Sequence, residues 1–262
     1  MMRSLWTSCT GMIAQQTKLD IIANNMANVN TTGFKKNMPT FEDLMYQTLR
    51  QPGATSGPDN QLPTGLQVGL GTRVVASPKL YLQGDFQSTG NPFDMCIEGD
   101  GFFQVLMPDG VIAYTRDGSF KPDSQGRLVT SEGYLLEPEI AIPEGARDFN
   151  VARDGIVTVT LPGDQEPQEI GQIQLARFVN PAGLKNIGQN LALETAASGA
   201  PTVSNPGEEG TGMIVTQYLE MSNVKVVEEM VNLIVTQRAY EINSKVITTS
   251  DEMLGQASNL KR

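Results

Sequence analysis

Residues 213–262 read MIVTQYLEMSNVKVVEEMVNLIVTQRAYEINSKVITTSDEMLGQASNLKR, without a proline. Large side chains recur in this segment at intervals of seven: Leu219, Val226, Leu233, Tyr240, Ile247 and Leu254. A second row on the neighbouring stripe has the same spacing: Ala239, Val246, Met253 and Leu260. Apolar residues that repeat every seven positions are typical of a long helix with one apolar seam. The segment therefore predicts a long C-terminal helix that must pack against a partner.

The N-terminus contains a shorter row of the same kind. Leu5, Met12, Leu19 and Met26 are also spaced by sevens. Gly11 weakens this helix by about 1 kcal/mol relative to alanine, so it is predicted to be marginal alone. Its natural partner is the C-terminal helix. The pattern leaves open whether the seams join copies of the chain or fold two amphipathic helices onto one globular core.

Proline and glycine separate the ends of the chain from its middle. All fifteen prolines lie between Pro39 and Pro206, and only three glycines fall outside residues 53–212. Both residues collect in turns and are disfavoured inside helices. We therefore expect a mixed α and β fold with paired terminal helices in a coiled-coil-like layer, a central all-β domain and an extended connector. The expected domains are residues 1–30 with 213–262, then 31–71 as connector, and 72–212 as the β-rich part.

The middle of the chain shows short strands separated by turns. Residues 73–76, 79–82, 156–161 and 170–179 alternate in the manner of strands. The Asp-Gly pairs at 109–110, 117–118 and 154–155 predict tight turns or hairpins. Strands at this spacing favour a β-sandwich or a barrel-like domain.

Charge and residue usage argue against several classes of function. The net charge is −10, and residues 51–212 hold nine Lys/Arg against twenty Asp/Glu, which argues against a nucleic-acid partner. The chain has no histidine, which removes Ser-His-Asp and Cys-His sites and most zinc sites. We expect no catalytic, cofactor-binding or metal-binding residue, and we interpret Cys9 and Cys96 as small buried apolar residues.

Residues 23–36, ANNMANVNTTGFKK, are where the first helix is predicted to end. This segment resembles the short motif shared by the axial proteins of the bacterial flagellum, the rod and hook subunits. The resemblance rests on Asn24, Asn25, Asn28, Thr32, Gly33 and Phe34. It continues in GDGFFQV at 99–105, YTRDGSF at 114–120 and QRAYEINSK at 237–245. Within that family, FEDLMYQTLRQPGA at 41–54 is similar to the distal-rod members.

The resemblance implies a structural subunit, without enzymatic activity or cofactor, that self-assembles into the tubular distal rod and transmits motor torque to the hook. Implied partners are further copies of the chain, neighbouring proximal rod and hook subunits, the surrounding outer-membrane and peptidoglycan ring proteins, and the flagellar export apparatus. The implied location is the basal body, where the rod crosses the periplasm, with export that uses no cleavable signal peptide. The residues expected to pack subunits together are Leu5, Met12, Leu19, Met26, Leu219, Val226, Leu233, Tyr240, Ile247 and Leu254.

The connector carries the distal-rod resemblance at Tyr46, Arg50, Gln51, Pro52 and Gly53. The spacing of Phe41, Leu44, Met45 and Leu49 predicts a short amphipathic helix, and residues 51–65 predict an extended loop. In the family such a connector lies between neighbouring subunits, and its distal-rod form implies a stiffer tube. Two other interpretations stay open. One is a proximal rod or hook subunit, and the other is a secreted β-domain hydrolase or carbohydrate-binding module on a coiled-coil stalk.

Overall fold

The computed structural model describes the chain except for residues 1, 54–62, 144, 147, 162–166 and 260–262. The chain divides into two compact units. The helical unit comprises Met1–Met26, Asn37–Pro78 and Lys225–Arg262, and the β unit comprises Ala27–Lys36 and Lys79–Val224. This division differs from the expected one, because residues 27–36 belong to the β unit and most of the connector belongs to the helical unit.

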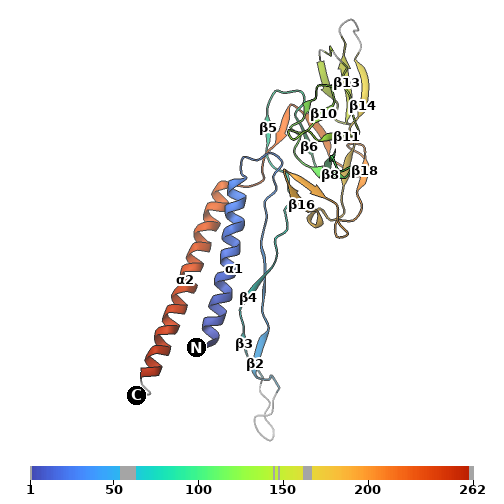
Figure 1. The fold of residues 1–262 in the computed structure, drawn as a ribbon. Coiled ribbons are helices and arrows are strands. Elements are labelled where there is room, and N and C mark those ends of the chain that lie inside the picture. The colour runs from blue at the N-terminus through green and yellow to red at the C-terminus, as the bar shows by residue number, and fades with distance from the viewer. Residues whose placement is uncertain (1, 54–62, 144, 147, 162–166, 260–262) are drawn as a thin grey trace. The chain divides into compact units, whose positions relative to one another are not determined.

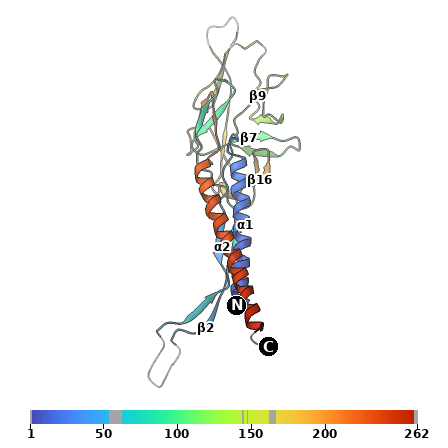
Figure 2. The same cartoon turned by 90° about the vertical axis from the view of Figure 1, so that its left-hand side faces the viewer.

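Two long helices, α1 (Met2–Ala27) and α2 (Val226–Asn259), run side by side in the helical unit (Figures 1 and 2). Together with the β unit they confirm the predicted mixed fold. The expectation that residues 213–225 are helical is wrong, because Met213–Thr216 and Tyr218–Glu220 form strands β19 and β20. Among the described residues, neither helix combines the length and apolar character needed to span a lipid bilayer.

The connector forms two antiparallel ribbons within the helical unit. Strand β1 (Thr40–Asp43) pairs with β4 (Thr72–Ala76), and β2 (Tyr46–Arg50) pairs with β3 (Leu66–Gly69). The prediction of a short helix from Phe41 to Leu49 is therefore wrong, because both residues lie in strands. Most of the loop predicted at 51–65 lies outside the described residues.

The β unit is built from antiparallel strand pairs. Its strands and a 3₁₀ helix are β5 (Phe86–Ser88), β6 (Met95–Glu98), β7 (Phe102–Leu106), β8 (Ile112–Thr115), β9 (Lys121–Pro122), β10 (Leu128–Val129), β11 (Leu135–Glu137), β12 (Asp148–Val151), β13 (Ile156–Thr160), β14 (Gln168–Gln172), β15 (Leu175–Arg177), η1 (Pro181–Gly183), β16 (Lys185–Gly188), β17 (Leu191–Leu193), β18 (Thr202–Ser204), β19 and β20. The largest sheet has nine strands in the order β16-β17-β8-β7-β11-β10-β9, with β15 between β7 and β18.

The Asp-Gly pairs form turns, as predicted. Gly110 and Gly155 have φ values of 76° and 83°, and they lie in the turns that join β7 to β8 and β12 to β13. At Asp117-Gly118 the Asp117 carboxylate accepts a hydrogen bond from the Ser119 N–H at 3.1 Å, which closes a tight turn.

The largest sheet is buried on both faces at its middle strand β7. Side chains of a strand point alternately to opposite faces, so neighbouring residues of β7 enter different clusters. Phe103 joins the main core, whereas Phe102 joins a second cluster with Tyr114 and Phe178. The main core also contains Val151 and Val157 from the separate sheet β12-β13-β14, which ties the two sheets together.

Candidate functional site

The contact between α1 and α2 is made by small and polar side chains. The hydroxyl oxygens of Ser4 and Ser250 lie 3.2 Å apart and form a hydrogen bond. About two turns further along α1, a Cβ atom at Gly11 would lie 3.0 Å from Asn243 Nδ2. Both contacts fit one antiparallel register. On α2 the buried residues Glu229, Thr236 and Ser250 share the spacing of sevens with Asn243, so all four lie on the face that contacts α1 at Asn243 and Ser250.

The predicted seam residues flank this contact rather than form its centre. Leu233, Ile247 and Leu254 on α2 are half-buried, while Val226 and Tyr240 are exposed. The four on α1, Leu5, Met12, Leu19 and Met26, are all half-buried. Leu219 does not belong to the helical seam, because it lies in β20 of the β unit, where it pairs with Gln87 of β5. That part of the prediction is wrong.

Helix α2 also carries a row of exposed apolar side chains, of which the sequence interpretation named Val246 and Met253 in its second row. Since a helix turns about 100° per residue, Val227, Val231 and Ile234 lie on the side of α2 opposite its contact with α1, whereas Val246 and Met253, three residues after Asn243 and Ser250, lie beside that contact. Ile242 in the middle of the row is 63% exposed. We call this row the outer stripe, and its members are Val227, Val231, Ile234, Val235, Ile242, Val246 and Met253.

Helix α1 also exposes large apolar side chains. Met2, Trp6 and Ile13 are more than half exposed. Exposed apolar residues scattered singly are ordinary, but a continuous row marks an interaction surface. The helical unit therefore presents apolar surface on both helices beyond what their mutual contact covers.

The motif segment begins in the helical unit, where Asn25 is buried near the end of α1. Its side-chain amide donates to the backbone oxygen of Asn37 at 2.9 Å, and its side-chain oxygen accepts from the Asn37 N–H at 2.9 Å. The two bonds join the last turns of α1 to the start of the connector. Asn24, on the same turn of α1, is exposed.

Further along the motif, the chain turns within the β unit. The Thr31 hydroxyl donates to Asn28 Oδ1 at 3.2 Å, and Asn190 Nδ2 donates to the backbone oxygen of Thr32 at 3.0 Å. Gly33 has φ = 67°, and a Cβ there would lie 2.7 Å from the backbone nitrogen of Asp117. Glycine is therefore required both by the backbone conformation and by the close approach. Phe34 follows as a buried side chain.

A buried ionic cluster lies immediately after the motif turn. Lys35 Nζ donates to Glu220 Oε1 at 2.6 Å and to the Leu82 oxygen at 2.7 Å. Arg116 Nη1 lies 3.5 Å from Glu220 Oε2, and its Nη2 donates to Gly99 O at 2.8 Å. Desolvation lowers the pKa of Lys35, and the neighbouring Glu220 carboxylate opposes that shift. The sequence interpretation did not identify this cluster.

Asn223, three residues after Glu220, binds the same two chain segments as the ionic cluster. Its side-chain oxygen accepts from the Lys36 N–H at 2.8 Å, and its side-chain amide donates to Leu80 O at 2.9 Å. Together with Glu220, whose Oε1 accepts from the Gly84 N–H at 2.9 Å, it fixes three chain segments of the β unit to one another.

The connector residues are exposed wherever they are described. Tyr46 and Arg50 are the first and last residues of β2, and all five residues of that strand are exposed. The Asp43 carboxylate raises the pKa of Tyr46 by hydrogen bonding. Gln51, Pro52 and Gly53 are exposed and lead into the segment outside the described residues.

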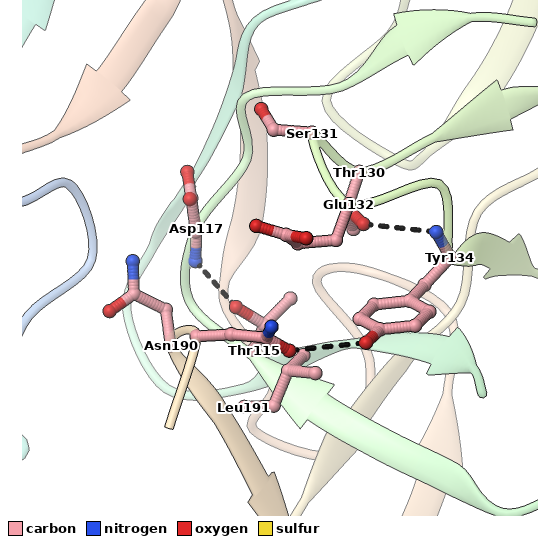
Figure 3. A pocket seen from close by; sticks show the side chains of 9 residues that line it. Thr115, Asp117, Thr130, Ser131, Glu132, Tyr134, Asn190 and Leu191 are labelled. Carbon is pink, nitrogen blue, oxygen red and sulfur yellow. Dashed lines mark hydrogen bonds between the residues drawn. The ribbon is translucent and has the colours of Figure 1, made fainter. Parts of the chain in front are cut away.

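A polar pocket of about 160 Å³ lies in the β unit beside the motif turn (Figure 3). Within it the Tyr134 hydroxyl donates to Gln189 Oε1 at 3.1 Å. The pocket wall is formed by Thr115, Asp117, Thr130, Ser131, Glu132, Tyr134, Gln189, Asn190 and Leu191. Most of these carry hydroxyl, amide or carboxylate groups. Among the residues that the structure describes, no three His, Cys, Asp or Glu side chains gather as a metal site would need.

The two cysteines have different surroundings. Cys96 is buried in β6, where burial raises the pKa of its thiol to about 12. Cys9 is exposed on α1, so the interpretation of both cysteines as buried is wrong for Cys9.

Three models of protein families match the chain. Residues 5–35 match the flagella basal body rod protein family. Residues 96–159 match the D1 domain of flagellar hook protein FlgE/F/G, and residues 215–260 match the C-terminal region of the flagellar basal body rod FlgEFG proteins.

Individual relatives are similar over the whole chain. The flagellar basal-body rod protein FlgG of Borreliella burgdorferi is 54% identical over 264 residues that cover all of both chains. FlgG of Buchnera aphidicola subsp. Schizaphis graminum is 54% identical over 260 residues, which cover 99% of this chain and all of the relative. The flagellar hook-basal body complex protein FlhP of Bacillus subtilis is 29% identical over 274 residues that cover all of both chains.

Proposed function

The chain belongs to the family of flagellar basal-body rod proteins and is a structural subunit of the distal rod, and we propose that its copies join through the exposed apolar sides of α1 and α2. The observation that supports this proposal is the outer stripe, whose upstream residues lie opposite the α1 contact and all of whose residues stay exposed in the single chain. Burying a side chain of this size stabilises an interface by about 1.5–3 kcal/mol. A row of seven such side chains is enough to drive polymerisation.

The predicted packing residues keep a place in this proposal, with one change. Leu5, Met12, Leu19 and Met26 on α1 and Val226, Leu233, Tyr240, Ile247 and Leu254 on α2 flank the contact between the helices, so they support the pair that presents the outer stripe. Leu219 is removed from the proposed packing residues, and the residues of the outer stripe are added. The assignment of the helices to the inner layer of the tube, and of the β-rich part to its outer layer, belongs to the same proposal.

The chain is a component of the flagellar basal-body rod, in a family of structural flagellar proteins. We further propose that it meets proximal rod and hook subunits at its ends and the outer-membrane and peptidoglycan ring proteins around it. The proposed path is through the flagellar export apparatus to a rod that crosses the periplasm. The proposal includes no enzymatic activity.

The substitution Ile234→Asp tests whether the outer stripe joins copies. Ile234 is exposed in the single chain, so the change leaves the α1 contact intact but puts a charge into the proposed interface. Loss of about 1.5–3 kcal/mol raises the critical concentration for polymerisation at least about tenfold. The measurement is sedimentation of the full-length protein at increasing concentration, with electron microscopy of the pellet. If the chain does not polymerise by itself, extension of preformed rods is measured instead.

Gln237→Asp is the matched control, because it adds the same charge at an exposed position of α2 outside the outer stripe. It is expected to polymerise like the unchanged protein. Equal polymerisation of both variants would show that the outer stripe does not join copies.

A further inference from the structure

We propose that a small cavity beside the buried ionic cluster binds a single-atom anion, chloride in solution. The cavity has a volume of about 20 Å³ and lies wholly within the β unit. Its lining is cationic and aromatic, with two asparagines and small residues: Gly33, Phe34, Lys35, Lys79, Tyr81, Phe102, Tyr114, Arg116, Asn186, Asn190 and Ala192.

The volume limits what this cavity holds. About 10–15 Å³ is enough for one water molecule, so the cavity accepts one particle of about that size. A halide ion is such a particle. Sulfate and phosphate, which have five heavy atoms, are too large.

Charge favours an anion over water. Three cationic side chains line the cavity, and none of the lining residues is a carboxylate. The neighbouring Glu220 carboxylate already forms ion pairs with Lys35 and Arg116 and accepts a hydrogen bond from the Gly84 N–H. Asp100 acts on Arg116 but is itself exposed and outside the lining. Buried cations without a matching anion are costly, and a bound halide removes that cost.

Two of the cationic side chains have N–H donors that make no hydrogen bond within the described part of the chain. Arg116 is 5% exposed, and its buried Nε has no hydrogen-bond partner in the described part of the chain. The Lys79 ammonium likewise has no hydrogen bond or ion pair with any residue that the structure describes, and lies 5.6 Å from the centre of the Phe34 ring. Lys35 uses two of its three donors on Glu220 and Leu82. Desolvation lowers the pKa of Lys79, as expected for a cation without a counter-charge.

The test compares thermal unfolding of the dispersed full-length protein in sodium chloride and in sodium gluconate of equal ionic strength. Gluconate is too large for the cavity, so only chloride raises the unfolding midpoint of the β unit, by about 2–4 °C when the site is nearly saturated. Lys79→Met removes one of the three cations from a half-buried position and is expected to abolish the difference between the salts. Lys79→Arg, which keeps the charge, is expected to retain it.

Lys121→Met is the control, because it removes a charge from an exposed position of β9 in the same unit. It should leave the chloride effect unchanged. Diffraction from crystals soaked in bromide adds a direct readout, with an anomalous peak expected between Lys79 and Arg116. Equal midpoints in the two salts, or an unchanged chloride effect in Lys79→Met, would overturn the proposal, as would a water in the cavity of bromide-soaked crystals. None of these measurements depends on polymerisation.

Discussion

Gly33 shows how a single residue of the motif acts on the fold. Its φ of 67° disfavours every residue with a Cβ, and Asp117 and Arg116 oppose a Cβ with backbone atoms that cannot move aside. Gly33→Ala is therefore expected to lower the free energy of unfolding by about 2–4 kcal/mol, as the sum of the conformational strain and the overlap. Urea unfolding followed by circular dichroism of the strands measures this loss.

Gly90 provides the comparison, because it has φ = 70° and no described atom would lie within 4 Å of a Cβ at this position. Gly90→Ala introduces the strain without the overlap, so its expected loss is about 1 kcal/mol. Equal losses in the two variants would show that the close approach to Asp117 contributes nothing.

Cys9 shows why the buried face of α1 is only partly predictable. Cys9 lies four residues after Leu5, which places it on the side of the predicted seam, yet it is exposed. The structure instead buries the side of α1 that contains Ser8 and Ile22. A heptad row identifies a helix, but small polar residues next to it decide which side meets the partner.

At the scale of elements, the sequence predicts that α1 pairs with α2. It does not predict which side chains form the contact between them. The long rows of apolar residues on α2 indicate two sides that need cover, and they predict an apolar partner for the seam. The structure instead places Ser250 against Ser4 and Asn243 against Gly11 of α1, where the helices approach closely through small side chains, and leaves the outer stripe exposed.

Cross-linking tests this antiparallel register. Ser4→Cys with Ser250→Cys, in a Cys9→Ala background, replaces two hydroxyls that lie 3.2 Å apart, so a disulfide is expected within each chain of the assembled protein. The measurement is the mass of peptides after digestion without reductant. Ser4→Cys with Thr248→Cys is the control, because residue 248 is exposed on another side of α2. Cross-linking of the control but not of the test pair would contradict the register.

Two local errors have a common physical cause. Leu219 fits the row of sevens, and Phe41 to Leu49 fit a helical spacing, yet both segments form strands. Their partners are distant in the sequence: Leu219 pairs with Gln87, and Phe41 pairs with Val74. Pairing with a remote strand overrides local periodicity, although the β-branched run at 214–216 favours a strand.

At the scale of the whole molecule, the paired helices, the strand-rich middle and the family are predictable from pattern and motif. The buried ionic cluster is not, because Lys35 and Arg116 reach Glu220 across 185 and 104 residues of sequence. No local spacing relates them. Only the fold brings the end of the motif, the end of β8 and the end of β20 together, and with them the cavity lined by three cations.

The distribution of charge over the whole chain leads to a prediction about assembly. The acidity lies in residues 51–212, whereas residues 1–50 carry five Lys/Arg against three Asp/Glu, and residues 213–262 carry five against six. Neighbouring copies therefore repel one another through their middles while their helices attract. Raising the ionic strength at pH 7 from about 0.01 M to about 0.15 M shortens the screening length from about 30 Å to about 8 Å, so the critical concentration is expected to fall. Light scattering in sodium gluconate measures this change apart from any effect of chloride. A critical concentration that rises with gluconate would mean that attraction between charges, rather than the apolar outer stripe, holds the copies together.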